Sequence, residues 1–130
     1  MNKVNNSFIL DFNNCVNEFL DNLKKLVNDI LFNKFYKKIK QLLKSNINTE
    51  ILIKKYIITI LPYNKLIQTK DSKLFSEIIN NEKDNIIILI QKINNIWNNI
   101  SEKDKNNIFD YLLVLSFHAT EYYKIIMKTL

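Results

Sequence analysis

Apolar residues recur at alternating steps of three and four along the first thirty positions of the chain. They are Ile9, Phe12, Val16, Phe19, Leu23, Leu26 and Ile30. This spacing puts them on one face of an α-helix, and it differs from the strict alternation of a half-buried strand. A second stripe, which includes Phe8, Cys15 and Leu20, widens that face. We therefore predict an amphipathic helix here, with Asn6 or Ser7 as its N-cap.

The helical pattern continues, with interruptions, through the next part of the chain. The apolar residues of Phe32 to Leu43 are again spaced for a helix, but their face is rotated relative to the first one. Either one long helix bends near Asn33 or two helices meet there, and the pattern leaves both alternatives open. A third helix is expected from Glu50 to Leu61, because the ring of Pro62 disfavours helical geometry in the residue before it. The residues that follow, 62–67, suggest a short helical turn.

Three more helices are predicted in the second half of the chain. The first is short, residues 73–79, and Asp71 or Ser72 can cap it. The five apolar residues 86–90 alone favour a buried strand, but the spacing from Ile93 to Ile100 is helical, and no second strand of similar quality exists to pair with them. A helix is therefore expected there. The last helix, Glu102 to Lys128, is apolar around most of its circumference, which is typical of the centre of a bundle.

These elements together predict an all-α fold. A chain of 130 residues has the length of one domain with one core, and its apolar content of 47% is ordinary for a globular protein. We expect a single helical domain spanning residues 1–130, built as a bundle of about five or six helices around a central apolar C-terminal helix.

The amino-acid composition excludes some kinds of site. The chain has no glycine, no arginine, one proline and one cysteine, and it is rich in isoleucine, asparagine and lysine. The abundant residues are encoded by AT-rich codons, so part of this bias reflects the genome. Phosphate-cradling loops depend on glycine, and glycine-rich nucleotide sites are therefore excluded. Cys15 lies in an apolar helical stretch and is expected in the core.

Membrane insertion and secretion are not expected. No apolar run approaches the roughly 20 residues that a helix needs to span a bilayer. The N-terminal residues lack the basic and then apolar pattern of a signal sequence. We therefore expect a soluble, intracellular protein.

Catalytic and metal-binding constellations are also not expected. His118 is the lone histidine, so one chain cannot assemble a histidine-rich metal site. Asp110, His118 and Glu121 are spaced to lie near one side of a helix, but their order reverses the Glu-x-x-His motif of carboxylate-bridged metal bundles. Ser116 is two residues from His118 and lies on a different part of the helix, which disfavours a hydrolase arrangement. We expect no enzyme, no cofactor and no metal, and the sequence identifies no small-molecule substrate.

The C-terminal part of the chain carries a recognisable pattern, W-x3-S-x3-K-x2-I-F-x-Y-L-x2-L. Its residues are Trp97, Ser101, Lys105, Ile108, Phe109, Tyr111, Leu112 and Leu115. This pattern resembles the C-terminal part of short uncharacterised proteins of giant nucleocytoplasmic DNA viruses, and Ile60 to Ile67 with Leu74-Phe75 resembles their middle part. The resemblance covers residues 55–120. It implies a viral protein of the host cytoplasm, in the viral factory, or of the virion, and it implies no activity.

Positive charge is concentrated in one segment. The net charge of the whole chain is +6, yet residues 24–55 alone hold nine lysines against two acidic residues. The nine are Lys24, Lys25, Lys34, Lys37, Lys38, Lys40, Lys44, Lys54 and Lys55. In the predicted second helix the lysines lie opposite the apolar residues, so they are expected to face solvent. This surface is either a site for a polyanion or the ordinary solvated exterior of a lysine-rich chain.

A binding protein is the function that these features favour. The leading hypothesis is a non-enzymatic viral accessory protein that binds nucleic acid non-specifically through the nine lysines, since ammonium groups neutralise phosphates without reading sequence. The lack of arginine disfavours base-specific contacts. The aromatic residues Phe32, Phe35 and Tyr36 could stack on single-stranded bases, but their spacing favours core packing. The alternative is a protein-interaction module, including a homodimer, that uses an apolar helix face such as Ile9 to Ile30.

Overall fold

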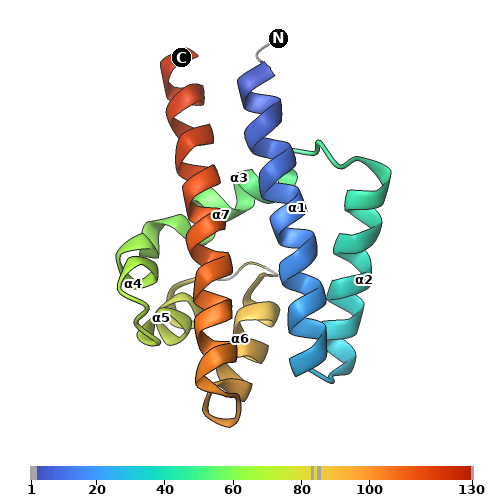
Figure 1. Ribbon diagram of the computed structural model, residues 1–130, viewed down its shortest axis with the longest axis vertical. Helices are drawn as coiled ribbons and strands as arrows, with labels where there is room; N and C mark the ends of the chain where they lie inside the picture. Colours follow the sequence, from blue (N-terminus) through green and yellow to red (C-terminus); the bar gives the residue numbers. More distant parts are fainter. Residues whose placement is uncertain (1–2, 83, 85, 130) are drawn as a thin grey trace.

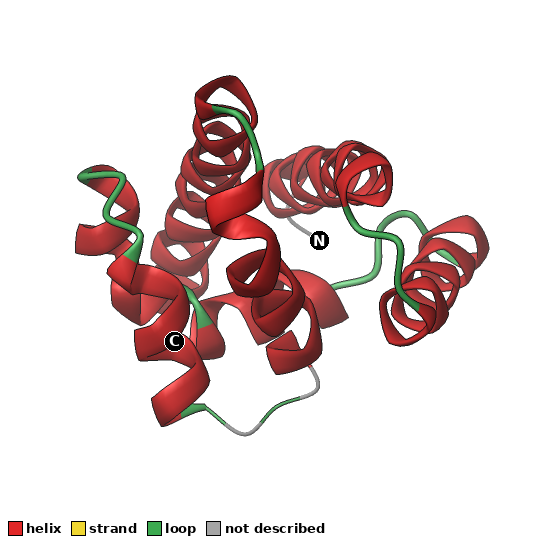
Figure 2. Cartoon of the chain, turned by 90° about the horizontal axis from the view of Figure 1, so that it is seen from below, coloured by secondary structure: helices red, strands yellow, loops and turns green. Residues whose placement is uncertain are grey.

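The structure is a computed structural model that describes residues 3–82, 84 and 86–129. Within these residues the chain forms seven α-helices and two 3₁₀ turns and has no strand (Figures 1 and 2). The elements are α1 (Lys3–Leu26), α2 (Ile30–Ser45), α3 (Ile51–Thr59), η1 (Leu61–Tyr63), α4 (Asn64–Gln68), α5 (Lys73–Asn81), α6 (Ile86–Ile96), η2 (Trp97–Asn99) and α7 (Glu102–Thr129). The all-α prediction is confirmed. The number of helices exceeds the expected five or six, because the turn after Pro62 continues into the separate helix α4.

The first two amphipathic stretches form two antiparallel helices, which resolves the alternative left open by the sequence (Figure 1). The break lies at residues 27–29, and Asp29 there has an extended backbone with φ −151°. Its carboxylate accepts a hydrogen bond from the amide of Phe32 at 3.1 Å, so Asp29 is the N-cap of α2. The rotation of the apolar face noted in the sequence therefore reflects a new helix and not a bend.

The prediction that Asn6 or Ser7 caps the first helix is wrong, because α1 begins at Lys3 and includes both residues. Predicted residues do mark the end of α3 and the beginnings of α5 and α7. Pro62 lies at the beginning of η1, after α3 has ended at Thr59. The Asp71 carboxylate accepts from the Lys73 amide at 3.0 Å, and the Ser101 hydroxyl accepts from the Asp104 amide at 3.1 Å. Both contacts satisfy amides that the helix itself leaves without a partner. The β-branched run 86–90 begins α6 and is helical, as expected.

Helix α7 packs against α1, α3 and α4, and α1 runs beside it for much of its length (Figure 1). Aromatic contacts join these elements: Phe19 of α1 stacks on Tyr111 of α7 at 5.0 Å between ring centroids, and Phe12 meets Tyr56 of α3 edge-on at 5.4 Å. The central packing of the C-terminal helix agrees with its broad apolar face. One side of α7 nevertheless stays exposed, and Val114 and Phe117 lie there.

The residues of the C-terminal sequence pattern are mostly packing residues. Ile108, Phe109, Leu112 and Leu115 are all buried. The Trp97 ring contacts the ring of Phe109 edge-on at 5.5 Å, and the Lys105 ammonium lies 5.8 Å from the Trp97 ring centroid. Ser101 caps α7. The pattern therefore describes how α7 begins and packs.

No helix in the described part of the chain has both the length and the apolar character that crossing a bilayer requires. The first two residues, which belong to the stretch considered for a signal sequence, lie outside the described residues.

Candidate functional site

Four of the nine predicted lysines lie on the solvent side of α2. Lys34, Lys37, Lys38 and Lys44 are exposed, while Phe32 and Leu43 on the other side of the helix are buried. The sequence of α2 contains no aspartate or glutamate. The helix therefore presents a positively charged exterior that its own residues do not neutralise.

Two further lysines lie where α1 ends, next to the beginning of α2. Lys24 and Lys25 are exposed in the last turn of α1, where cations are favoured by the helix dipole. The Lys24 ammonium donates to the side-chain oxygen of Asn33 at 3.3 Å and lies 4.6 Å from the ring centroid of Tyr36. These contacts place Lys24 beside α2. We call Lys24, Lys25, Lys34, Lys37, Lys38 and Lys44 the basic surface.

Lys40 points the other way, into the contact between α2 and α1. Its ammonium lies 2.7 Å from the carboxylate of Asp21 and donates to the side-chain oxygen of Asn17 at 2.7 Å. The Tyr36 hydroxyl donates to the same carboxylate at 2.6 Å. The hydrogen bonds from Lys40 and then Tyr36 lower the pKa of Asp21, and the bond to Asp21 raises the pKa of Tyr36. Lys40 thus joins two helices.

The last two predicted lysines belong to α3 and lie apart from the basic surface. Lys54 pairs with Glu50 one turn earlier at 2.8 Å, and Lys55 pairs with Asp84 at 3.2 Å. The structure therefore gathers six of the nine lysines along α2 and the end of α1. It places Lys40, Lys54 and Lys55 in ion pairs elsewhere.

The aromatic residues near the lysines pack inward, as their spacing favours. Phe32 is fully buried, and its ring lies 6.2 Å from that of Tyr36, which is half-buried and bonded to Asp21. Phe35 is also half-buried and contributes to the wall of a cavity. None of the three is exposed on the basic surface.

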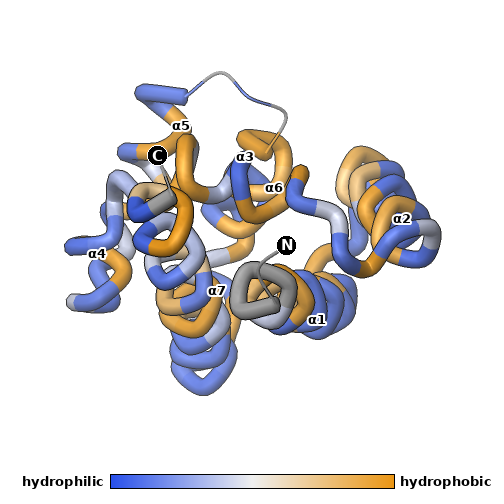
Figure 3. Tube along the Cα trace, turned by 90° about the horizontal axis from the view of Figure 1, so that it is seen from above, coloured by the Kyte–Doolittle hydropathy of each residue, from blue (hydrophilic) through white to orange (hydrophobic). Residues whose placement is uncertain are grey.

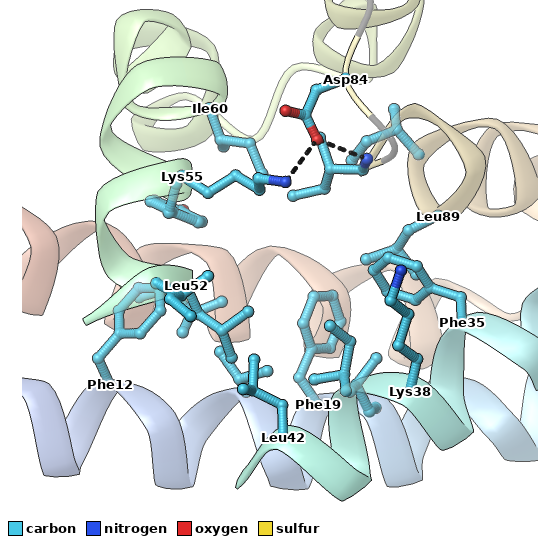
Figure 4. A pocket seen from close by; sticks show the side chains of 18 of the residues that line it. Phe12, Phe19, Phe35, Lys38, Leu42, Leu52, Lys55, Ile60, Asp84 and Leu89 are labelled. Carbon is cyan, nitrogen blue, oxygen red and sulfur yellow. Dashed lines mark hydrogen bonds and ion pairs between the residues drawn. The ribbon is translucent and has the colours of Figure 1, made fainter. Parts of the chain in front are cut away.

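That cavity, of about 750 Å³, is a feature that the sequence reasoning missed. It lies between α2, α3 and α6, with residues of α1 and α7 behind them, and apolar side chains make most of its wall (Figure 4). Figure 4 shows Phe12 and Phe19 of α1, Leu42 of α2, Leu52 of α3 and Leu89 of α6 around it. Helix α2 packs on α1 and α6, whereas α3 packs on α1 and α7, so the space between α2 and α3 stays open.

The polar groups of the cavity are concentrated at two places. One edge of α2 contributes Lys38, Gln41, Lys44 and Ser45. On the other side, the Lys55–Asp84 ion pair links α3 to the segment before α6 (Figure 4). The same Asp84 carboxylate accepts from the first amide of α6, Ile86, at 3.2 Å. The cavity therefore combines an apolar interior with a rim on which positive charges outnumber negative ones.

One signal in the sequence could have indicated the cavity. In α2 the apolar residues Phe32, Leu43, Phe35, Ile39 and Leu42 cover an arc wider than one neighbouring helix can bury. Likewise, α6 is mostly hydrophobic and would need partners on several sides (Figure 3). These faces meet around the cavity and only partly cover each other.

The residues considered for catalysis do not converge. Asp110 pairs with Lys70 at 3.0 Å and Glu121 with Lys124 at 3.1 Å, while His118 lies among the rings of Phe8 and Phe117. Burial is the main cause of a lowered His118 pKa.

The two candidate nucleophiles are buried. Ser116 is hydrogen-bonded to Tyr56, and Cys15 is a core residue whose pKa burial raises to about 12. Across the residues that the structure describes, no three histidine, cysteine or acidic side chains gather in a way that could hold a metal ion.

Comparison with protein-family models, with curated proteins and with solved structures finds no match to this chain.

Proposed function

We propose that the protein binds nucleic acid without sequence preference through the basic surface. The observation that carries this proposal is the exterior of α2, where Lys34, Lys37, Lys38 and Lys44 are exposed and no acidic residue belongs to the helix. Two carboxylates that contact α2, Asp21 and Asp29, are already paired with other lysines, Lys40 and Lys92. The four ammonium groups thus keep an uncompensated positive potential toward solvent.

The mode of binding follows from the side chains present. Lysine ammonium groups are compact point charges that neutralise phosphates and release counterions, which gives affinity for the backbone of any sequence. The commonest base-specific contact is made by the planar fork of arginine, and the chain has no arginine. Backbone binding of this kind weakens steeply with salt, and the salt dependence reports how many phosphates are contacted.

A binding titration with random-sequence duplex and single-stranded DNA tests this proposal. We expect binding at about 50 mM salt that weakens by at least about 10-fold at 200 mM. The variant in which Lys34, Lys37, Lys38 and Lys44 are replaced by glutamine should lose this binding. It should also keep its helical circular dichroism.

A matched control variant has the same net charge as the quadruple variant of the basic surface. It replaces four exposed lysines of other helices, Lys65, Lys73, Lys103 and Lys128, by glutamine. We expect this control to bind DNA within a few-fold of the wild type, since the basic surface is intact. Absence of DNA binding at low salt would contradict the proposal. Equal losses of affinity in the two quadruple variants would also contradict it, because they would mean that only the net charge of the protein matters.

A protein-interaction role is the second candidate, and α7 gives the observation that favours it. Val114 and Phe117, one helical turn apart, are 45% and 58% exposed. The apolar face of α1, by contrast, is occupied by the core of the same chain, where Ile9, Phe12 and Leu23 are buried. A dimer would therefore use α7. Sedimentation of the wild type and of Phe117→Asp tests whether the protein dimerises through α7. A wild-type dimer that dissociates in Phe117→Asp would support this role. A monomeric wild type would exclude the homodimer.

A further inference from the structure

We propose that the cavity between α2, α3 and α6 binds a fatty acid, with its alkyl chain inside and its carboxylate at the α2 edge. This inference goes beyond nucleic-acid binding: it concerns the apolar cavity, which shares only Lys38 and Lys44 with the basic surface. It rests on the size of the cavity, on its apolar wall and on the charges at its rim.

The size of the cavity suits a small ligand. Protein interiors are close-packed and leave few voids larger than a water molecule, so a space of about 750 Å³ is far larger than a packing defect. Pockets for small molecules and cofactors usually measure about 300–1,000 Å³. A helix of a partner protein is about 10–12 Å wide with its side chains and would need a longer, open face. The Lys55–Asp84 ion pair, which joins α3 to the segment before α6, closes one side instead (Figure 4).

The apolar wall of the cavity favours an alkyl chain as the buried part of the ligand. Aromatic and branched apolar side chains surround the space, including Phe12, Phe19, Phe35, Leu42, Leu52 and Leu89 (Figure 4). These side chains offer no hydrogen bonds to a polar ligand. Transfer of an alkyl chain from water into such surroundings is favourable for each methylene.

The charges at the rim of the cavity favour an anionic head group. Lys38 and Lys44 lie at the α2 edge of the cavity and form no ion pair among the described residues. Across the cavity, Asp84 is engaged by Lys55, so its negative charge is already compensated there. In Figure 4 Lys38 rises from α2 next to Phe35, on the side of the cavity where Leu89 lies. An anionic head group at this edge lies near Lys38 or Lys44, whose ammonium groups can donate charge-assisted hydrogen bonds.

Calorimetric titration with laurate, below its critical micelle concentration, tests the proposal directly. We expect one laurate per chain. The shorter octanoate should bind on the order of 100-fold more weakly, since each methylene contributes about 4-fold. Dodecyltrimethylammonium, which has a similar chain and a cationic head, should bind at least 10-fold more weakly than laurate.

Two variants, each with a matched control, locate the site. Leu42→Trp fills the cavity from a half-buried position of α2 and should abolish laurate binding, while Val114→Trp, on the exposed side of α7, should leave it unchanged. Replacing Lys38 and Lys44 by glutamate should weaken laurate and strengthen the cationic amphiphile. The matched pair Lys65→Glu and Lys103→Glu should do neither. The double substitution of Lys38 and Lys44 keeps the proposal testable if Leu42→Trp does not fold.

The outcomes separate this site from the DNA-binding surface. Leu42→Trp retains every lysine and should still bind DNA as the wild type does. Laurate binding that persists in Leu42→Trp, or that shows no dependence on chain length, would overturn the proposal. The absence of saturable one-to-one laurate binding would also overturn the proposal. That result is expected if the cavity instead accepts a helix of another protein.

Discussion

The hydroxyl oxygens of Tyr56 and Ser116 lie 2.7 Å apart in the buried contact between α3 and α7. Tyr56 also donates to the backbone oxygen of Leu112 at 3.1 Å, so its hydroxyl accepts from Ser116. Burial raises the pKa of the Tyr56 phenol, which therefore stays protonated and serves as a donor at neutral pH. This pair fixes the position of α3, which is one wall of the cavity.

Replacing Tyr56 by phenylalanine should lower the free energy of unfolding by about 1 kcal/mol, because one buried hydrogen-bonded group is lost without a change of shape. Urea denaturation of Tyr56→Phe, Ser116→Ala and the double variant measures this. The double variant should lose less than the two single variants together, since both remove the same contact. Strictly additive losses would show that the hydroxyls do not interact in solution.

Asn13 ties α1 to the connection between α2 and α3. Its side-chain amide donates to the backbone oxygens of Ile47 at 2.7 Å and Thr49 at 2.9 Å. Asn13→Leu keeps the branching of the side chain but leaves both oxygens without this donor, so we expect a loss of about 2–3 kcal/mol in unfolding free energy. The matched control is Asn14→Leu at the adjacent exposed position, which should change stability by less than about 0.5 kcal/mol.

Hydrogen exchange distinguishes a local loosening of the connection between α2 and α3 from destabilisation of the whole chain. In Asn13→Leu the amides of residues 47–51 should exchange faster than those of α7 relative to the wild type, because the connection loses its anchor. A uniform increase over the whole chain would contradict the proposed role of Asn13 in holding this segment.

The helices were predictable from sequence because their information is local. The three-and-four spacing of apolar residues, Pro62 and the capping residues Asp71 and Ser101 act within one or two turns, and each marks a real boundary or face. Asp29 shows the limit: it caps α2 as the other residues cap their helices, but its carboxylate also pairs with Lys92 of α6. Sequence spacing carries no record of such a distant partner.

The candidate site was predictable only in part, for a related reason. The helical period correctly placed Lys34, Lys37, Lys38 and Lys44 on the exterior of α2. Lys40 belongs to the same run, yet it turns toward Asp21, because α2 packs on α1 along that side. The wide apolar faces of α2 and α6 indicate incomplete burial, but the cavity itself depends on the relative placement of α2, α3 and α6, which is a tertiary property.

Asp29 should make the protein less stable in acid. The hydrogen bond from the Phe32 amide and then the one from Lys92 lower its pKa. Because the pKa is lowered in the folded state, the carboxylate contributes its full stability above the ordinary aspartate pKa of about 4 and loses it as the pH falls through the lowered pKa of the folded state.

Comparison of wild type with Asp29→Asn by urea denaturation at several pH values tests this. Asparagine still caps a helix but cannot pair with Lys92. The difference in stability should therefore be present at pH 7 and shrink through the acid range. A difference that is independent of pH would mean that the charge of Asp29 does not contribute.

His118 should give the protein a second pH dependence at a higher pH. Burial lowers its pKa, although the nearby Asp11 opposes the shift, and its side chain lies among the rings of Phe8 and Phe117. Since the lowered pKa favours the neutral form in the folded state, stability is complete above the unfolded histidine pKa of about 6.5 and declines as the pH falls below it. His118 is the lone histidine of the chain, so its imidazole resonances titrate without overlap in an NMR experiment. We expect a midpoint below that of a free histidine, and a loss of stability as the pH falls below about 6.5 that His118→Gln removes. A midpoint at or above the ordinary value would show that Asp11 outweighs burial.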